Sequence, residues 1–403
     1  MVVTRRALFK VYPTAAQAVQ LDEWNVLHAR LYNACLEQRI TAYRKCGKSL
    51  SYYDQQNELP ALKAELPECL PLGSHALQET VRRVDRAFAA FFRRVKVGQK
   101  PGFPRFKSAT RYKGFTYPDP SGWKFALGPN GKHGFLDITN FGKLKIRGKP
   151  RQWGKPTTLT LTRRNEQWYA SITVRCEPNR EAGTAAIGLD LGCESAMTLS
   201  NGDKVENPRY LRATLRGLKV LQRKLANQKR GGANREKTRL VLCRLHQKVA
   251  NQRKDFQHQE TAKLIKTYGL IATETLNVKN MTANGGRYKA GLNRSILDVG
   301  MATIKQMLSY KAEEADSFRL IEVPTRKVKP SQTCPSCGRQ HKKLLSTRWH
   351  SCECGCELPR DVAAAQVMLA WANNELGTGL LASPCSLGIK TQETTPIAVR
   401  LGA

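Results

Sequence analysis

The segment CPSCGRQHKKLLSTRWHSCECGCELPRD, residues 334–361, joins a cysteine cluster directly to an acidic residue. Cys334 and Cys337 are separated by two residues and followed by a glycine, the knuckle spacing that brings two thiolates to one tetrahedral ion. Cys352 and Cys354 form a second, tighter pair, and the gap between the pairs is close to the range of zinc ribbons. Thiolate ligands of this kind favour zinc in a closed, structural site.

The third cysteine of the second half leaves the ligand set open. Cys356 lies two residues after Cys354 and could replace either Cys352 or Cys354. His341 and His350 are close in the sequence, but histidines in this position are more often surface residues than ligands. The zinc ligands that we predict are Cys334, Cys337, Cys352 and Cys354.

The charge of the chain indicates a polyanionic partner. Its 403 residues include 67 Lys and Arg against 32 Asp and Glu, a formal net charge of +35. Distributed cations bind phosphates with release of counterions, so nucleic acid is the expected partner. An anionic membrane surface is the alternative, but the sequence shows neither a basic amphipathic anchor nor a long apolar run, and we expect no membrane partner.

Length and cysteine usage indicate a multidomain protein of a reducing compartment. At about 150 residues to a domain, the chain has room for roughly two to four domains. The first residues, MVVTRRALFKVYPTAAQ, contain no apolar run of the signal-peptide type. Twelve cysteines in such a chain are expected to stay reduced or to bind metal. We therefore expect a cytoplasmic protein.

The N-terminal half alternates between β and helical patterns. Residues 4–12 predict a short basic strand, and apolar residues recur at helical spacing over 15–45. A second helix is expected over 75–96, with Ser74 as its N-cap. Short alternating runs over 122–176 are typical of an antiparallel β-module, which the N-terminal strand would join. The helical segment would then be an insertion between that strand and the β-module.

Two stretches of this half combine cations with aromatic or apolar residues. The helix over 75–96 carries arginines beside its apolar stripe, and residues 100–117 mix Gly, Pro, Lys, Arg and aromatic residues. Bases stack on aromatic rings while cations hold phosphates. A solvated basic face over packed apolar residues is an equally good interpretation. The arginines that we expect to contact nucleic acid are Arg82, Arg86, Arg105 and Arg111.

From residue 185 onward the pattern becomes that of an α/β domain. The expected elements are β-rich runs over 185–202, a helical pair over 209–263, a strand over 268–281, a helix over 298–316, a strand over 318–324 and a helix over 361–376. Between Arg209 and Lys263 the helical pair carries 16 Lys and Arg against 3 Asp and Glu. So uneven a ratio favours phosphate contact over a merely solvated face.

Three acidic residues stand out in a chain that is poor in acids. Asp190 lies in the apolar run GLDLG, Glu274 near the end of an apolar strand, and Asp361 at the start of a helix. A carboxylate in an apolar strand is unfavourable unless it is paired or bound to metal. A turn for Asp190, an ion pair for Glu274 and an N-cap for Asp361 are the structural alternatives. Together, three such carboxylates would hold two Mg²⁺ ions, the arrangement that hydrolyses phosphodiesters.

These motifs occur in the order seen in the TnpB family of transposon-encoded, OrfB-type proteins, which this chain resembles. The segments that carry the resemblance are GLDLG (188–192), TETLNVKNM (273–281), PSQTCPSCG (330–338) and CGCELPRDVAAAQVML (354–369). KVYPTAAQ, LQETVRRVDRAFAAFF and KPGFPRFK in the N-terminal half add to it, so the resemblance spans about residues 5–375. The family consists of RuvC-like nucleases, the apparent ancestors of type V CRISPR effectors, which bind a guide RNA and cleave DNA beside a short motif.

The resemblance implies an RNA-guided DNA endonuclease, prokaryotic and associated with the nucleoid. Asp190, Glu274 and Asp361 would be its RuvC triad, holding Mg²⁺, and one site would cut both strands in turn. Its partners would be a transposon-derived guide RNA (omega RNA) and double-stranded target DNA with a flanking motif. The residues that by resemblance lie where motif and duplex contacts are expected are Tyr52, Tyr53, Gln78 and Thr80.

The resemblance also implies an α/β multidomain architecture. A RuvC (RNase H-like) nuclease domain would span 183–330 and 359–380, with an inserted zinc ribbon over 331–358 that positions the junction carrying Asp361. A β-barrel-like wedge module would comprise 1–14 and 100–180, with a helical recognition bundle over 15–99 inserted into it. Residues 381–403 would form a flexible tail.

Two positions depart from the family pattern and keep other functions open. The usual Asp-Arg-Asp before the last helix is Pro359-Arg360-Asp361 here, and the Asn that commonly follows is Ala363. Weaker support of the triad would give an RNA-guided DNA-binding repressor with little or no cleavage. A guide-free transposon DNA-binding factor is a further alternative. A guide-free junction resolvase would not need so large a basic N-terminal half.

Overall fold

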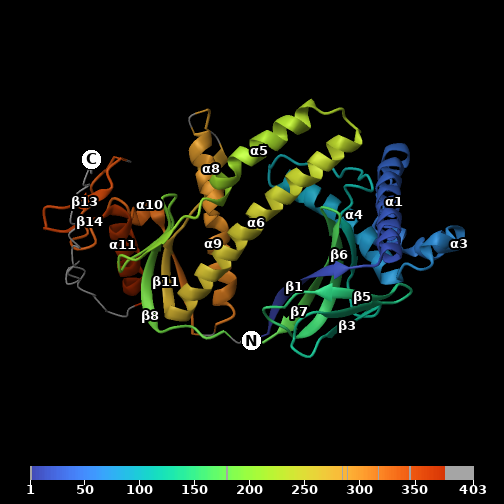
Figure 1. Cartoon of the computed structure of the whole chain (residues 1–403), viewed down its shortest axis with the longest axis horizontal. Coiled ribbons are helices and arrows are strands. Elements are labelled where there is room, and N and C mark those ends of the chain that lie inside the picture. The colour runs from blue at the N-terminus through green and yellow to red at the C-terminus, as the bar shows by residue number, and fades with distance from the viewer. Residues whose placement is uncertain are drawn as a thin grey trace, which may run out of the picture. The chain divides into compact units, whose positions relative to one another are not determined.

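The computed structural model describes residues 2–177, 180–283, 285–287, 289–315, 317–344 and 346–376. The chain divides after Glu177 into two compact units, each of which is described separately below (Figure 1). The tail predicted over 381–403 lies outside the described residues. Within the described ranges, every helix is either too short or too polar to cross a membrane.

A seven-stranded antiparallel sheet forms the base of the first unit, with the strand order β2-β6-β7-β1-β5-β4-β3. Its strands are β1 (Val3–Tyr12), β2 (Gly114–Tyr117), β3 (Trp123–Leu127), β4 (Gly134–Ile138), β5 (Gly142–Arg147), β6 (Lys155–Arg164) and β7 (Gln167–Cys176). The first strand of the chain is central, because β1 pairs with β7 along most of its length and with β5 near its end. Burial alternates along β1, where Phe9 and Val11 are buried and Leu8 and Tyr12 are exposed, as expected when successive side chains face opposite sides.

Helices between β1 and β2 complete the core of this unit. They are α1 (Ala15–Cys46), α2 (Tyr52–Asn57), α3 (Leu59–Glu65), the 3₁₀ turn η1 (Pro67–Cys69) and α4 (Ser74–Lys96). Trp24 of α1 packs against Phe115 of β2, so helices and sheet share one apolar core. The prediction that Ser74 caps α4 is wrong: the N-cap is Gly73, and the Ser74 hydroxyl instead accepts a hydrogen bond from Lys63 Nζ at 2.9 Å.

The second unit contains a mixed five-stranded sheet with the order β10-β9-β8-β11-β12. Its strands are β8 (Ala185–Asp190), β9 (Ser195–Leu199), β10 (Lys204–Glu206), β11 (Tyr268–Glu274) and β12 (Arg319–Val323). Strands β8, β11 and β12 are parallel to one another, and β9 is antiparallel to β8. Ile187 and Ile271 face one apolar core, whereas Ala272 and Val323 face a second core on the other side of the sheet.

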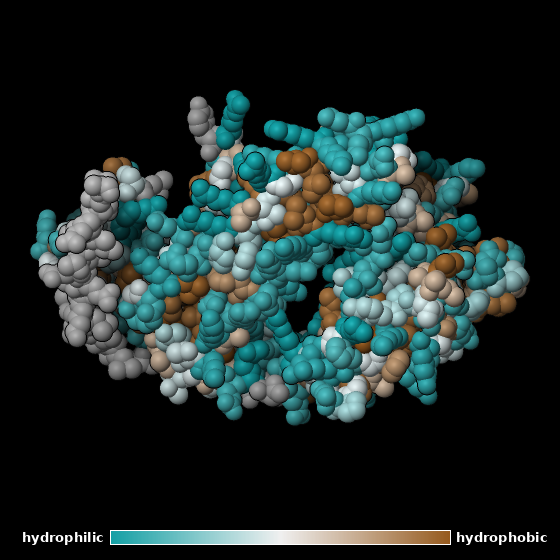
Figure 2. Space-filling model, in the orientation of Figure 1, coloured by the Kyte–Doolittle hydropathy of each residue, from teal (hydrophilic) through white to brown (hydrophobic). Residues whose placement is uncertain are grey.

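Helices cover both faces of this sheet (Figure 1). They are α5 (Tyr210–Asn227), α6 (Ala233–Thr267), α7 (Val278–Ala283), α8 (Ala290–Val299), α9 (Met301–Ala312), α10 (Thr325–Val328) and α11 (Arg360–Glu375). Helix α11 packs on β8 and β11 through Ala365 and Met368, and α6 and α9 contribute to the core on the opposite face. In the space-filling view, an apolar patch lies over α5 and α6, where Val220 and Val241 are exposed (Figure 2).

One predicted helix is divided in two. The helix expected over 298–316 is interrupted at Gly300, whose φ of 71° is left-handed and ends α8 before α9 begins. A Cβ at this position would lie 2.4 Å from Gln257 Nε2, so the close approach also requires glycine. The element order otherwise gives the α/β multidomain fold that the sequence pattern predicted.

Candidate functional site

Two of the three singled-out acids lie side by side at one edge of the second sheet. Asp190 is the last residue of β8, and Glu274 is the last residue of β11. The strands are parallel, and their register pairs Thr273 with Leu189, which places Glu274 next to Asp190. The carboxyl ends of parallel strands are the usual location of functional side chains in α/β sheets.

Helix α11 brings the third acid to the same edge. Gly188 lies against the helix backbone so closely that a Cβ there would be 1.8 Å from the carbonyl oxygen of Ala365. Asp190 is two residues beyond Gly188 on the same face of β8, and Asp361 is one turn before Ala365 on the same face of α11. Two strand residues and one helical turn cover similar lengths, about 6–7 Å and about 5–6 Å. The charge of Asp361 raises the pKa of Asp190, which shows that the packing of α11 at Gly188 brings the two acids near each other.

The electrostatics of the site show that these carboxylates act on one another. Burial is the main cause that raises the pKa of Asp190. The negative charges of Glu274 and Asp361 raise it as well, and the pKa reaches about 8. Burial also raises the pKa of Glu274, against the opposing effects of Lys305 and Thr325. A cluster of acids in a dry environment resists full ionisation unless cations are bound there.

The structural alternatives for Glu274 and Asp361 do not describe what is observed. Helix α11 begins at Arg360 with Pro359 as its N-cap, so Asp361 is a first-turn residue and not the cap. Within the described ranges, Asp190, Glu274 and Asp361 have no ion-pair partner within 4.0 Å. The ligand oxygens of the three are not all within 4.8 Å of one another, so the three acids do not form a group that holds one ion jointly.

Sequence reasoning missed a cation beside this cluster. Lys305 of α9 places Nζ 3.4 Å from the carbonyl oxygen of Glu274 and 2.8 Å from the carboxylate of Glu322. It pairs with Glu322 of β12, so the carboxylate of Glu274 remains free of a direct ion pair. Lysines are so numerous in this chain that no sequence signal distinguishes this one.

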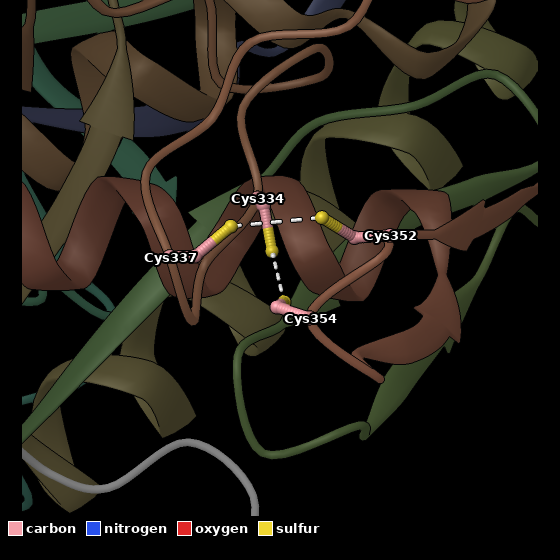
Figure 3. Close-up of side chains that lie close together, drawn as sticks. All are labelled: Cys334, Cys337, Cys352 and Cys354. Atoms are coloured by element: carbon pink, nitrogen blue, oxygen red, sulfur yellow. Dashed lines mark hydrogen bonds between the residues drawn. The ribbon is translucent and has the colours of Figure 1, made fainter.

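The predicted zinc ligands converge on one point. Figure 3 shows the sulfur atoms of Cys334, Cys337, Cys352 and Cys354 pointing toward one another, and all four lie within 4.8 Å of each other. The Sγ atoms are 3.6 Å apart in the pair Cys334 and Cys354, and also in the pair Cys337 and Cys352. Sulfurs bound at about 2.3 Å to a tetrahedral zinc ion lie about 3.8 Å apart. The cluster therefore has the dimensions of a four-thiolate zinc site.

Backbone amides favour the thiolate form at Cys337 and Cys352, two of the four cysteines of the cluster. The backbone amide of Arg339 lowers the pKa of the Cys337 thiol to about 7, and the backbone of Cys354 lowers the pKa of Cys352. Burial has the opposite effect on Cys334, whose pKa is raised. Zinc binds thiolates, so these amides prepare the outer side of the cluster for a metal.

A second group of potential ligands lies behind the first. Cys356 and His350 are fully buried, and their ligand atoms lie within 4.8 Å of one another and of Cys334. The expectation that His350 is a surface residue is wrong, because its exposed fraction is 0% and Lys343 Nζ contacts its Nδ1. His341 is exposed, as expected. Cys356 therefore packs beneath the four-thiol cluster.

The cysteine segment is tied directly to the start of α11. Strand β13 (Trp349–Ser351) pairs with β14 (Glu357–Pro359), and α11 begins at the next residue. The Arg360 guanidinium donates hydrogen bonds to the carbonyl oxygens of Leu344, at 2.7 Å, and Thr347, at 3.2 Å. The position of Asp361 thus depends on the hairpin that carries the second cysteine pair.

The nucleic-acid contacts predicted in the first unit differ in accessibility. The exposed ones are Tyr53, Arg82, Arg86, Arg105 and Arg111, and Gln78 is half-buried. The Tyr52 ring is buried, with the Arg82 guanidinium 4.7 Å from its centroid. The Thr80 side chain is buried, and its hydroxyl is 2.8 Å from His28 Nδ1.

Comparison with protein families finds two matches in this chain. Residues 169–285 match the OrfB_IS605 model, which is described as a probable transposase. Residues 302–368, which include the cysteine segment, match the Cas12f1-like TNB domain. Among solved structures, the complex of Cas12f1 with single guide RNA and target DNA shares the fold with a TM-score of 0.59 at 12% identity, covering 91% of this chain and 98% of that one.

Two relatives extend the comparison over the sequence. A protein of Streptomyces pristinaespiralis named "Putative RNA-guided DNA endonuclease" is 32% identical over 400 residues, covering 97% of this chain and 93% of the relative. InsQ of Escherichia coli (strain K12), which carries the same name, is 29% identical over 67% of each chain. The resemblance found in the ordered motifs is confirmed at this level of similarity, and the chain therefore belongs to the TnpB family of OrfB-type proteins.

Proposed function

We propose that this protein is an RNA-guided DNA endonuclease that hydrolyses target DNA at Asp190, Glu274 and Asp361. One observation carries the proposal: the half-buried Asp190 at the end of β8 has a pKa raised to about 8, with the charges of Glu274 and Asp361 among the causes. Repulsion of this kind is unfavourable for stability, and clusters of perturbed acids mark functional sites. Family membership, with relatives named as RNA-guided DNA endonucleases, supports the same conclusion.

The three carboxylates fit a pair of Mg²⁺ ions. Oxygen donors suit Mg²⁺, whereas thiols suit zinc, so the acids and the cysteines would bind different metals. Paired ions lie about 3.5–4 Å apart, so the carboxylates that hold them need not all meet at one point. When bound, such ions activate the attacking water and stabilise the leaving oxygen. Asp190, Glu274 and Asp361 would hold the ions through their carboxylate oxygens.

The zinc ion would have a structural role at the nuclease centre. Cys334, Cys337, Cys352 and Cys354 would close the site with four thiolates, which leaves no open position for chemistry. The hairpin held by zinc continues into α11, so the metal would fix the position of Asp361. This role accounts for a cysteine cluster that leads directly into an acid.

The domains would divide the work of recognition and cleavage. A RuvC-like domain over 183–330 and 359–380, with the ribbon over 331–358, would cut the DNA. A wedge over 1–14 and 100–180 and a helical domain over 15–99 would hold the omega RNA and the target duplex. The exposed contacts would be Tyr53, Arg82, Arg86, Arg105 and Arg111, with Gln78 beside them.

The experiment that tests this proposal is expression of the chain with the transposon sequence downstream of its gene. RNA that co-purifies would be sequenced, reprogrammed and tested with Mg²⁺ against plasmids with randomised flanks. Asp190→Ala is expected to abolish cleavage while RNA binding persists. Asp255→Ala, which changes an exposed acid of α6, is the matched control and should cleave normally.

Other outcomes would select between functions. A defined RNA that directs DNA binding without cleavage would indicate the repressor, for which Pro359 and Ala363 beside the triad are the supporting features. The absence of any defined RNA would contradict both the endonuclease and the repressor, and would leave a guide-free DNA-binding factor as the function. Cleavage by Asp190→Ala at the rate of the control would show that the triad has been assigned wrongly.

A further inference from the structure

The outer face of the first sheet presents two exposed aromatic rings in register with a lysine. The register pairs Tyr12 of β1 with Lys145 of β5, and Phe135 of β4 with the same Lys145. The three side chains therefore form one row across three strands, on the side of the sheet that faces away from the core. Phe135 is 53% exposed and Tyr12 is 37% exposed, although large aromatic side chains are usually buried.

The rings of Tyr12 and Phe135 differ in the side chains that lie against them. The Arg147 guanidinium lies 4.8 Å from the centroid of Tyr12, and Lys10 Nζ lies 4.9 Å from it. Phe135 has no ring or cation partner among the residues that the structure describes. An exposed ring without a partner on a rigid antiparallel sheet is available to stack with a ligand.

A pocket adjoins the free ring. It has a volume of about 580 Å³ and is lined by Phe135, Lys145, Arg147, Lys132, His133 and the backbone around Gly128. A volume of this size is typical of sites for small ligands. The backbone N–H of Gly148 donates to His133 Nδ1, so the proton of the neutral ring is on Nε2. His133 is exposed and can donate this proton to a ligand.

The charge around the row is almost entirely positive. Residues 123–151, which include β3, β4 and β5, contain 7 Lys and Arg and a single acid, Asp137. In register, Asp137 faces Lys143 and Lys124, which neutralise it. A protein partner would have to be strongly acidic to fit this face, whereas a nucleic-acid strand supplies both phosphates for the cations and bases for the rings.

We propose that this aromatic-cationic face, defined as Lys10, Tyr12, Phe135, Lys145 and Arg147, binds an unpaired segment of RNA. One base stacks on Phe135 in the pocket, and the phosphates on either side contact Lys145 and Arg147. The ring of Phe135 requires an unstacked base, which single strands, loops and bulges offer and duplexes do not. The His133 donor suits a 2′-hydroxyl, which accepts hydrogen bonds and is present in RNA only. The proposal rests on the proposed function, since the guide RNA would supply the segment.

The test compares variants of the full chain in binding to a fluorescent, unstructured 12-nucleotide RNA. Phe135→Ala is expected to weaken binding about 5- to 100-fold, and Phe135→Trp should retain it, because a stacked base depends on the ring. Tyr43→Ala, which removes another exposed aromatic ring of the first unit, is the matched control and should bind normally. Lys145→Ala should reduce the slope of log K against log salt by about 0.7, whereas Phe135→Ala should leave the slope unchanged.

Each contrary outcome overturns the proposal. Equal affinity of Phe135→Ala and the unmodified chain would show that no base stacks there. If Phe135→Ala lost as much affinity for a 12-base-pair RNA duplex as for the single strand, the face would bind RNA by charge alone. If it lost more affinity for single-stranded DNA than for single-stranded RNA, the face would be assigned to DNA. Self-association that disappears in Phe135→Ala would assign it to a second copy of the chain. Cleavage by Asp190→Ala at the rate of its control would overturn the assignment of the triad but leave this RNA affinity unchanged, so the two proposals fail separately.

Discussion

At Asp190 the unfavourable electrostatics of this site and its proposed chemistry concern one residue. Its carboxylate is half-buried at the end of β8 and close to two other acids, and its pKa is raised to about 8. The sequence indicated Asp190 because a charge is rare in an apolar strand. It could not indicate Lys305, which reaches the site from α9 and differs from the other lysines only in its position.

The raised pKa makes stability depend on pH in a definite direction. Between pH 3.8, the ordinary pKa of an aspartate, and about pH 8, the folded protein binds a proton at Asp190 that the unfolded chain has released, so the free energy of unfolding falls as pH rises. Asp190→Asn removes this dependence and should be more stable than the unmodified chain at pH 8 in EDTA, by a few kcal/mol, or roughly 5–10 °C in Tm.

Thermal unfolding at pH 5, 6.5 and 8 measures this effect. The difference in Tm between Asp190→Asn and the unmodified chain should increase with pH. Mg²⁺ should reduce this difference at pH 8 by neutralising the cluster of acids. Asp255→Asn is the control and should show no such trend, because this residue is exposed. A gap that is constant from pH 5 to pH 8 would contradict the assignment of the raised pKa.

At the scale of elements, the contact between β8 and α11 determines the geometry of the triad. Gly188→Ala would place a Cβ 1.8 Å from the Ala365 carbonyl oxygen, so the helix has to move. We expect a loss of about 1–3 kcal/mol in the free energy of unfolding, together with a large loss of cleavage as Asp361 leaves its position. Denaturant unfolding and a cleavage assay give the two quantities.

Gly217→Ala provides the matched control for this change. Gly217 lies inside α5, and its added Cβ would meet only Leu245 Cδ2, at 3.7 Å. Alanine is the better helix former, so this variant should gain about 0.5–1 kcal/mol and cleave normally. If Gly188→Ala cleaved at the same rate as Gly217→Ala, the contact between β8 and α11 would not be needed for the function of Asp361.

The ribbon hairpin permits a test of which cysteines hold the metal. Cys352→Ser should lose most of its bound zinc, because this sulfur is 3.6 Å from Cys337 in the four-thiol cluster. Cys356→Ser should keep its zinc, since Cys356 belongs to the buried group beneath the cluster. Metal analysis of the purified proteins gives the ratio of zinc to protein. Cys46→Ser, which changes an exposed thiol of α1, is the control. If Cys356→Ser lost its zinc and Cys352→Ser kept it, the ligand would be Cys356 and not Cys352.

The same scale shows why some elements were predictable and others were not. Long amphipathic or alternating patterns identified β1, α1 and α4 almost to the residue, because burial of one face imposes the periodicity. The break between α8 and α9 was missed, because a single glycine in a helical pattern does not reveal its φ angle. The close contact at Gly188 was equally invisible, since it depends on a helix more than 170 residues away in the chain.

At the scale of the whole molecule, the ordered motifs identified the family and implied a domain boundary between residues 180 and 183, and the structure divides the chain after Glu177. Charge could be counted from the sequence, but its arrangement could not. The row formed by Tyr12, Lys145 and Phe135 depends on the register of three strands, two of which are more than 120 residues from the first. Local patterns predict which residues face away from the core, but not which of them meet.

The excess of positive charge predicts a strong dependence of DNA binding on salt. With a net charge of +35, binding to random-sequence duplex DNA should engage about 6–10 phosphates and weaken by about 10³–10⁵ between 50 and 200 mM salt. Arg244 and Lys248 are exposed on α6, in the basic helical pair, and no residue in the described ranges pairs with them. Replacing both with glutamine should reduce the slope of log K against log salt by about 1.8, if each contacts one phosphate. A slope unchanged in fluorescence anisotropy titrations would show that this helical pair does not contact the duplex and that the phosphate contacts belong to other basic segments.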